Sequence, residues 1–168
     1  MKDYTKVVEE CRKNLIPRKI SNASLEHASV LFDNLLQLAI DNKLPVKIVT
    51  GCLEKPFYEK ISNKVKDVLE SGNRVDIIAL CNKEKLQHSD LAKMVNEHTH
   101  GSVKLLSADK EHNQQHFILV GDKSYRIEFS DRDKIAEANF NNELVGEFLQ
   151  GEFETLSKQQ EIFASYQG

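Results

Sequence analysis

The stretch QQHFILVGDKSYRIEF, residues 114–129, decides the fold class of this chain. Residues 117–120 are four consecutive apolar residues, which is typical of a strand that is buried on both faces. Gly121 and Asp122 then supply a turn, and a glycine in the first loop position favours a type II′ hairpin. The sequence therefore predicts a central strand that is joined to a second strand by a tight turn.

The second strand of this hairpin has an alternating pattern. Its apolar side chains are Tyr125, Ile127 and Phe129, and its polar side chains are Ser124, Arg126 and Glu128. Strict alternation predicts that one face is buried and the other is solvated, as in a strand that lies nearer the edge of a sheet.

Helical and strand-like segments alternate before the hairpin. Apolar spacing and flanking caps or stops predict helices over 3–15, 24–42, 56–72 and 89–101, and strands over 46–51, 74–81 and 102–108. Such alternation predicts a sheet that is at least partly parallel, with right-handed crossovers. One or two helices are expected within 141–166, with Phe148, Leu149, Phe153 and Leu156 on the inner face.

The composition is that of an ordinary soluble protein, so we expect a single domain over residues 1–168 with 1–20 as a helical extension. The net charge of −3 gives no support to nucleic-acid binding, although a local basic patch stays open. No apolar run approaches the roughly 20 residues that a membrane-spanning helix needs. The charged start does not resemble a signal peptide, and Cys11, Cys52 and Cys81 form no CxxC pair; we therefore expect a reduced, cytoplasmic protein.

Three segments together resemble the phospholipase D-like superfamily. SLEHASVLFDNLLQLAIDNKLPVKIVTG (24–51) is similar to the helix and strand that open such domains. HFILVGDK (116–123) resembles the segment that carries the HxKxxxxD motif, and EANFNNELVGEFLQGEFETL (137–156) looks like the asparagine-containing stretch and closing helices. The similarity spans most of residues 20–157 and implies an α/β fold: a mixed, mostly parallel sheet flanked by helices, with a C-terminal hairpin and closing helices.

Active members of the superfamily hydrolyse phosphodiesters through a covalent phosphohistidine, and two motifs meet at one site. The resemblance thus implies that a single-domain member pairs as a homodimer. One histidine is the nucleophile and the other protonates the leaving oxygen, while the lysines stabilise the phosphate charge without a metal.

This chain departs from the motif in either alignment. If Asp122 takes the aspartate position, Gln115 and Phe117 fall on the histidine and lysine positions. If His116 takes the histidine position, the lysine and aspartate positions are Ile118 and Lys123. A slip of one residue turns a strand side chain to the other face, so His116 cannot simply replace the motif histidine.

Two sets of candidate site residues follow. If the domain is active, the catalytic set would be His116, Asp122 and Lys123, with His27 as a further histidine. Ligands of open α/β sheets bind beyond the carboxyl ends of strands, which gives a candidate pocket at Thr50, Gly51, Cys52, Asn82 and Ser107, with His27. His98 and His100, even with Glu111 and His112, lack recognisable ligand spacing, so no metal and no cofactor are predicted.

The sequence favours a non-catalytic phospholipase D-like recognition or assembly module, as a homodimer or with a protein partner. The resemblance associates such modules with nucleic-acid enzymes and phage–host systems. A metal-independent phosphodiesterase or nuclease with a divergent site remains open, as does a sensor of a nucleotide or other small anion.

Overall fold

The computed structural model describes residues 1–168 except 52, 54–56, 107–114, 131–134, 160 and 163–168. In the described part of the chain, eight strands form one mixed sheet in the order β1-β7-β6-β5-β2-β3-β4-β8. The strands are β1 (Ile20–Asn22), β2 (Val46–Thr50), β3 (Val75–Leu80), β4 (Gly101–Leu106), β5 (His116–Val120), β6 (Ser124–Ser130), β7 (Ile135–Asn139) and β8 (Glu161–Ile162).

Parallel pairing joins β2 to β3 and β3 to β4, as the alternating helices and strands predict. The remaining neighbours pair antiparallel, because β5, β6 and β7 follow one another as a meander and β1 and β8 close the two edges. The mixed α/β class is confirmed, but the expectation of a mostly parallel sheet was wrong: among the described residues, two strand pairings are parallel and five are antiparallel.

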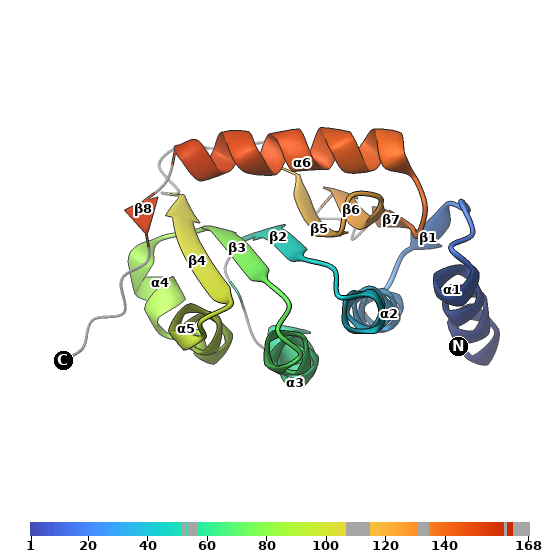
Figure 1. The fold of residues 1–168 in the computed structure, drawn as a ribbon, viewed down its shortest axis with the longest axis horizontal. Helices are drawn as coiled ribbons and strands as arrows, with labels where there is room; N and C mark the ends of the chain where they lie inside the picture. Colours follow the sequence, from blue (N-terminus) through green and yellow to red (C-terminus); the bar gives the residue numbers. More distant parts are fainter. Residues whose placement is uncertain (52, 54–56, 107–114, 131–134, 160, 163–168) are drawn as a thin grey trace.

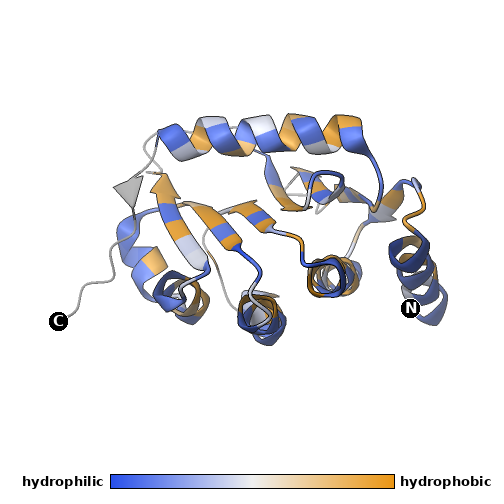
Figure 2. Ribbon diagram, in the orientation of Figure 1, coloured by the Kyte–Doolittle hydropathy of each residue, from blue (hydrophilic) through white to orange (hydrophobic). Residues whose placement is uncertain are grey.

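Helices cover both faces of the sheet (Figure 1). They are α1 (Lys2–Asn14), α2 (Leu25–Asn42), α3 (Phe57–Glu70), α4 (Lys83–Gln87), α5 (Asp90–Glu97) and α6 (Glu143–Lys158). The helices α2, α3 and α5 lie side by side on one face, and α6 crosses the other face alone. Because helices cover both faces, the side chains of β2 and β3 are buried on both sides of the sheet. Figure 2 shows the apolar segments of these strands.

Two hydrophobic cores follow from the two layers. The larger core joins α1, α2, α3 and α5 to the sheet, and its sheet side includes Ile48, Ile77 and Ile118. The smaller core lies under α6, where Leu149, Phe153 and Leu156 pack with residues such as Val49 and Phe117. These three α6 residues face inward, as the sequence predicts. The same prediction was wrong for Phe148, whose side chain is 57% exposed.

The hairpin forms where the sequence predicts it, with two differences. Val120 pairs with Ser124, so the loop has three residues instead of two, and Gly121 adopts a φ of 63° there. The strand β6 is third from the edge, and its polar side is covered: Arg126 is only 6% exposed because α2 lies over that face. The prediction of a half-buried strand was therefore wrong. An alternating sequence shows which side chains are polar, but a polar side chain can be buried when it has hydrogen-bond partners.

The remaining differences concern short elements. The strands β1 and β7, the helix α4 and the two-residue β8 have little apolar periodicity, and the sequence did not predict them. β1 and β7 pair with each other in register from Ile20↔Ala138 to Asn22↔Ala136, so they extend the sheet beyond the hairpin.

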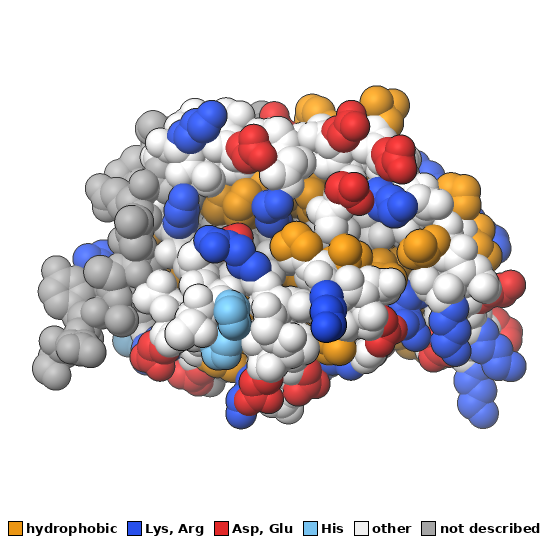
Figure 3. All heavy atoms as spheres, in the orientation of Figure 1, with side chains coloured by type: hydrophobic (Ala, Val, Ile, Leu, Met, Phe, Trp, Pro, Cys, Tyr) orange, Lys and Arg blue, Asp and Glu red, His pale blue; other side chains and the backbone are white. Residues whose placement is uncertain are grey.

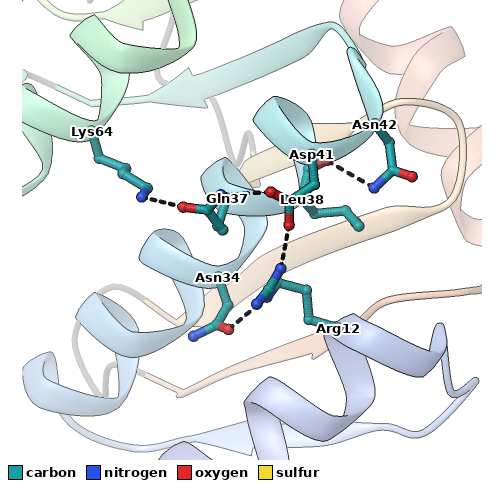
Figure 4. Close-up of polar contacts among 7 residues, drawn as sticks. All are labelled: Arg12, Asn34, Gln37, Leu38, Asp41, Asn42 and Lys64. Carbon is teal, nitrogen blue, oxygen red and sulfur yellow. Dashed lines mark hydrogen bonds and ion pairs between the residues drawn. The ribbon is translucent and has the colours of Figure 1, made fainter.

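Helix α1 is held against α2 by polar contacts that Figure 4 shows. The Nε of Arg12 donates to Asn34 Oδ1 at 3.1 Å, and its Nη1 forms a 2.5 Å ion pair with Asp41. Lys64 of α3 donates to Gln37, whose own amide donates to Asp41. Together with the buried Val8 and Cys11, these contacts attach the first helix to the main helical layer.

Candidate functional site at the carboxyl ends of the strands

Polar side chains gather at one end of the central strands, where β2 ends and β5 begins. We call this end of the strands the strand edge. Phe117 pairs with Val49, and one further step in this register sets His116 beside Thr50. His116 also pairs with Glu128 of β6. Side chains in register share a face, so these three belong to the α2 side of the sheet. A Cβ at Gly51 would lie 3.5 Å from the ring of His116, which places that ring over the end of β2.

Arg126 is the buried charge nearest to this edge. Its Nε donates to Asn22 Oδ1 at 2.8 Å, and its Nη1 lies 3.3 Å from a carboxylate oxygen of Glu128. Its guanidinium carbon lies 5.6 Å from the centre of the Phe32 ring. The buried guanidinium is thus partnered from β1, β6 and α2, as a buried charge must be to persist.

Thr50 and Tyr58 form a second polar contact at the same edge. Their hydroxyl oxygens are 2.5 Å apart, and Tyr58 comes from the first turn of α3. Burial raises the pKa of Tyr58 to about 12, although the hydrogen bond to Thr50 and the charge of Arg126 act in the opposite direction. The Tyr58 phenol is therefore neutral at physiological pH and serves as a hydrogen-bonding group.

His27 lies in the first turn of α2, where its backbone N–H donates to the capping hydroxyl of Ser24. Its ring stacks on Tyr4 of α1 with 3.8 Å between the centroids. Its Nδ1 is buried, and within the described residues it has no hydrogen-bond partner. Burial also raises the pKa of Tyr4 to about 12. His27 thus has an aromatic neighbour from the N-terminal helix, which the sequence did not predict.

The structure does not bring the proposed catalytic set together. Asp122 and Lys123 lie in the loop at the far end of β5, so that the five residues of β5, roughly 15 Å of strand, separate this loop from the end where His116 lies. The first turn of α6 is packed on that loop, because a Cβ at Gly146 would lie only 1.8 Å from the carbonyl oxygen of Asp122. His116 therefore shares its surroundings with Thr50 and Glu128, and the grouping with Asp122 and Lys123 is not formed within this chain.

The members of the candidate strand-end pocket have different surroundings, and the pocket stays a prediction. Thr50, Gly51 and His116 lie together, whereas the Asn82 side chain caps α4 by accepting from the N–H of Lys85. Cys52 and Ser107 lie outside the described residues. Among the described residues, no group of three or more His, Cys, Asp or Glu side chains is arranged to hold a metal.

The two positions at which the resemblance would place a motif lysine are buried in apolar surroundings. Phe117 belongs to the core under α6, and Ile118 belongs to the core under α2. A lysine at either position would therefore point into an apolar core. The residues that sequence reasoning missed are Asn22, Tyr58, Arg126 and Glu128. Only Arg126 and Glu128 gave a signal, as polar residues that alternate with the buried side of β6.

Comparison with known proteins shows which solved structures share the fold of this chain. No family model matches the sequence, and no curated protein matches it. The structure resembles NucT from Helicobacter pylori, with a TM-score of 0.63 and 14% identity over 87% of this chain and 99% of that one. It also resembles Nuc from Salmonella typhimurium, a phospholipase D family member, with a TM-score of 0.64 and 13% identity over 89% of this chain and 100% of that one.

The third similar structure is TrmBL2, an archaeal chromatin protein with a novel mode of DNA binding. It aligns with a TM-score of 0.63 and 10% identity, over 96% of this chain and 62% of that one. The likenesses to Nuc and NucT show a phospholipase D-like fold for this chain, as the sequence resemblance implies. In the part of the chain that the structure describes, no helix is long and apolar enough to cross a membrane.

Proposed function

We propose that this domain is a non-catalytic phospholipase D-like module for recognition or assembly. Two observations at the strand edge carry the proposal. Its polar side chains form hydrogen bonds with one another. The positions where the motif would have a lysine are the buried Phe117 or Ile118. Phosphoryl transfer to a histidine needs a cation that stabilises the developing charge. Arg126 is buried and already bonded to Asn22 and Glu128, so it is a poor substitute for such a cation.

Two exposed apolar side chains at the same edge support a protein contact. Phe129 of β6 is 52% exposed, and Ile135 of β7 is 53% exposed. The strands β6 and β7 are paired neighbours, with Ser130 opposite Ile135. A homodimer through this edge is the assembly that we propose, and light scattering on Phe129→Ser and wild type tests it: the wild type should be a dimer and the variant a monomer.

The catalytic part of the proposal is tested by a nuclease assay in EDTA. Single- and double-stranded DNA and RNA are incubated with the wild type, with His116→Ala, and with His100→Ala as a control. His100 directly precedes β4, at the opposite end of the parallel strands from His116, and its side chain is exposed. We expect no cleavage beyond buffer by any of the three proteins.

Cleavage by the wild type and by His100→Ala that disappears in His116→Ala would overturn the proposal. It would establish the rival, a divergent metal-independent phosphodiesterase in which His116 acts beside Thr50 and Glu128. Binding of DNA without cleavage, measured in the same samples by gel shift, would agree with a recognition role and with the likeness to the chromatin protein TrmBL2. Binding to no nucleic acid would direct the recognition role to protein partners.

A further inference from the structure

The outer surface of α6 carries two large apolar side chains that the fold does not use. Leu144 is 79% exposed and Phe148 is 57% exposed. They lie one turn apart, so they are neighbours on the helix surface. The core contacts of α6 are made by Leu149, Phe153 and Leu156 on its other side. Figure 3 shows hydrophobic side chains on the outer rim of the molecule, over α6.

Gly151 continues this face by one further turn. It follows Leu144 by seven residues and Phe148 by three, which is the spacing of one helix face. A Cβ at Gly151 would meet nothing within 4 Å, in contrast to Gly146, whose Cβ would clash with the Asp122 backbone. One face of α6 is therefore an apolar seam formed by Leu144, Phe148 and Gly151, with open space beside Phe148. A second helix can pack against a face of this kind.

The charges beside the seam indicate which kind of helix fits. The exposed Glu143, Glu147 and Glu154 lie along one flank, and the partly exposed Glu152 lies on the other. Lys158 is the basic residue of α6. Pairing two copies of α6 would bring these carboxylates together, which is unfavourable, whereas lysine or arginine side chains beside an apolar stripe would be complementary.

We propose that the outer face of α6 binds a basic amphipathic helix of a partner protein. The apolar stripe of the partner packs on Leu144 and Phe148 and approaches closely at Gly151, while its basic flanks face the glutamates. This surface lies on the helix itself and does not include the strand edge at His116. The proposal extends the recognition role, and it can fail while the nuclease result stands, because the two tests report on different surfaces.

The test uses the whole chain and a synthetic, fluorescently labelled amphipathic peptide of about 20 residues, with leucines on one face and lysines on both flanks. Anisotropy measures its affinity for the wild type, Leu144→Ser and Phe148→Ser. Leu25→Ser is the matched control, since Leu25 is an exposed leucine, 42% accessible, on a different helix. We expect each α6 variant to bind about tenfold more weakly, the usual loss for a central apolar contact, and the control to bind like the wild type.

A second peptide separates this surface from general stickiness. It keeps the leucines and replaces every lysine by glutamate, and we expect it to bind at least about tenfold more weakly because its charges repel those of α6. Added salt should weaken the binding of the basic peptide. No binding of the basic peptide to the wild type would overturn the proposal. So would equal binding by the α6 variants or equal binding of the acidic peptide. A homodimer that Phe148→Ser dissolves would replace the partner helix by a second copy of this chain.

Discussion

The Nε of Arg126 on β6 donates a 2.8 Å hydrogen bond to Oδ1 of Asn22 on β1, joining residues that are 104 positions apart in the chain. Both side chains are buried, at 6% and 2% exposure. The contact spans β7, which lies between the two strands, and it fixes the outer strands of the sheet beneath α2. It also holds the buried positive charge of the sheet near His116 at the strand edge.

Arg126→Met is expected to destabilise the protein by about 2 kcal/mol, because it leaves Asn22 Oδ1 and the Glu128 carboxylate without their donor. Urea unfolding followed by circular dichroism measures this change. Arg74→Ala is the control: the side chain of Arg74 is 67% exposed, and its pairing with Asp76 is worth less than about 1 kcal/mol. If Asn22→Ala and Arg126→Met are fully additive in the double variant, the two side chains are not coupled and the interpretation fails.

Two glycines of α6 should respond in opposite directions to alanine. Gly146→Ala forces a Cβ to 1.8 Å from the Asp122 carbonyl oxygen, so we expect a loss of about 3 kcal/mol as the loop and α6 move apart. Gly151→Ala meets open space and should stabilise the helix by about 0.5–1 kcal/mol through its higher helix propensity. Thermal unfolding of both variants measures the difference. A stable Gly146→Ala protein would show that α6 does not pack on the β5–β6 loop in this way.

Alkaline pH should unfold the protein through its buried tyrosines. Burial raises the pKa of Tyr4, Tyr58 and Tyr125 to about 12, against 10 in an unfolded chain. The folded state therefore retains protons that the unfolded state loses, so the stabilising effect is complete below pH 10 and declines as the pH rises from 10 towards 12. Urea midpoints measured across this range should fall, and the rise of tyrosinate absorbance should coincide with unfolding.

Tyr58→Phe isolates the contribution of one of these phenols. The variant leaves the Thr50 hydroxyl without its partner, so we expect a loss of about 1 kcal/mol at neutral pH. It should also show a shallower decline in stability above pH 10, because one buried phenol has been removed. An unchanged alkaline profile would mean that the Tyr58 phenol is not protected from ionisation by burial.

Arg12→Ala should loosen the first helix. It removes the contacts to Asn34 and Asp41, and we expect a global loss of only about 1 kcal/mol because Asp41 is partly exposed. Hydrogen exchange of the α1 amides is the more direct measurement, and it should accelerate in the variant relative to α2. Lys13→Ala, at an exposed neighbouring position, is the control that should exchange like the wild type. Equal α1 exchange in all three proteins would show that the apolar contacts of Val8 and Cys11 suffice.

The sequence by itself determined the elements whose signals are local. Ser24 caps α2 as its position predicts, and the apolar runs of 46–50, 75–80 and 117–120 became the central strands because each is buried between two helical layers. The absence of an HxKxxxxD motif was also a property of the sequence alone, and it needed no structure.

Only the tertiary structure decided the composition of the strand edge. Asn22, Tyr58 and Arg126 come from three separate elements, and hydrogen-bond partners far apart in sequence leave no periodic pattern. The same reason explains the errors: alternation in β6 predicted a solvated face, but Arg126 is buried because Asn22 and Glu128 satisfy it. Phe148 has the character of a core residue but is exposed, because α6 packs on the sheet through Leu149, Phe153 and Leu156 on its other side.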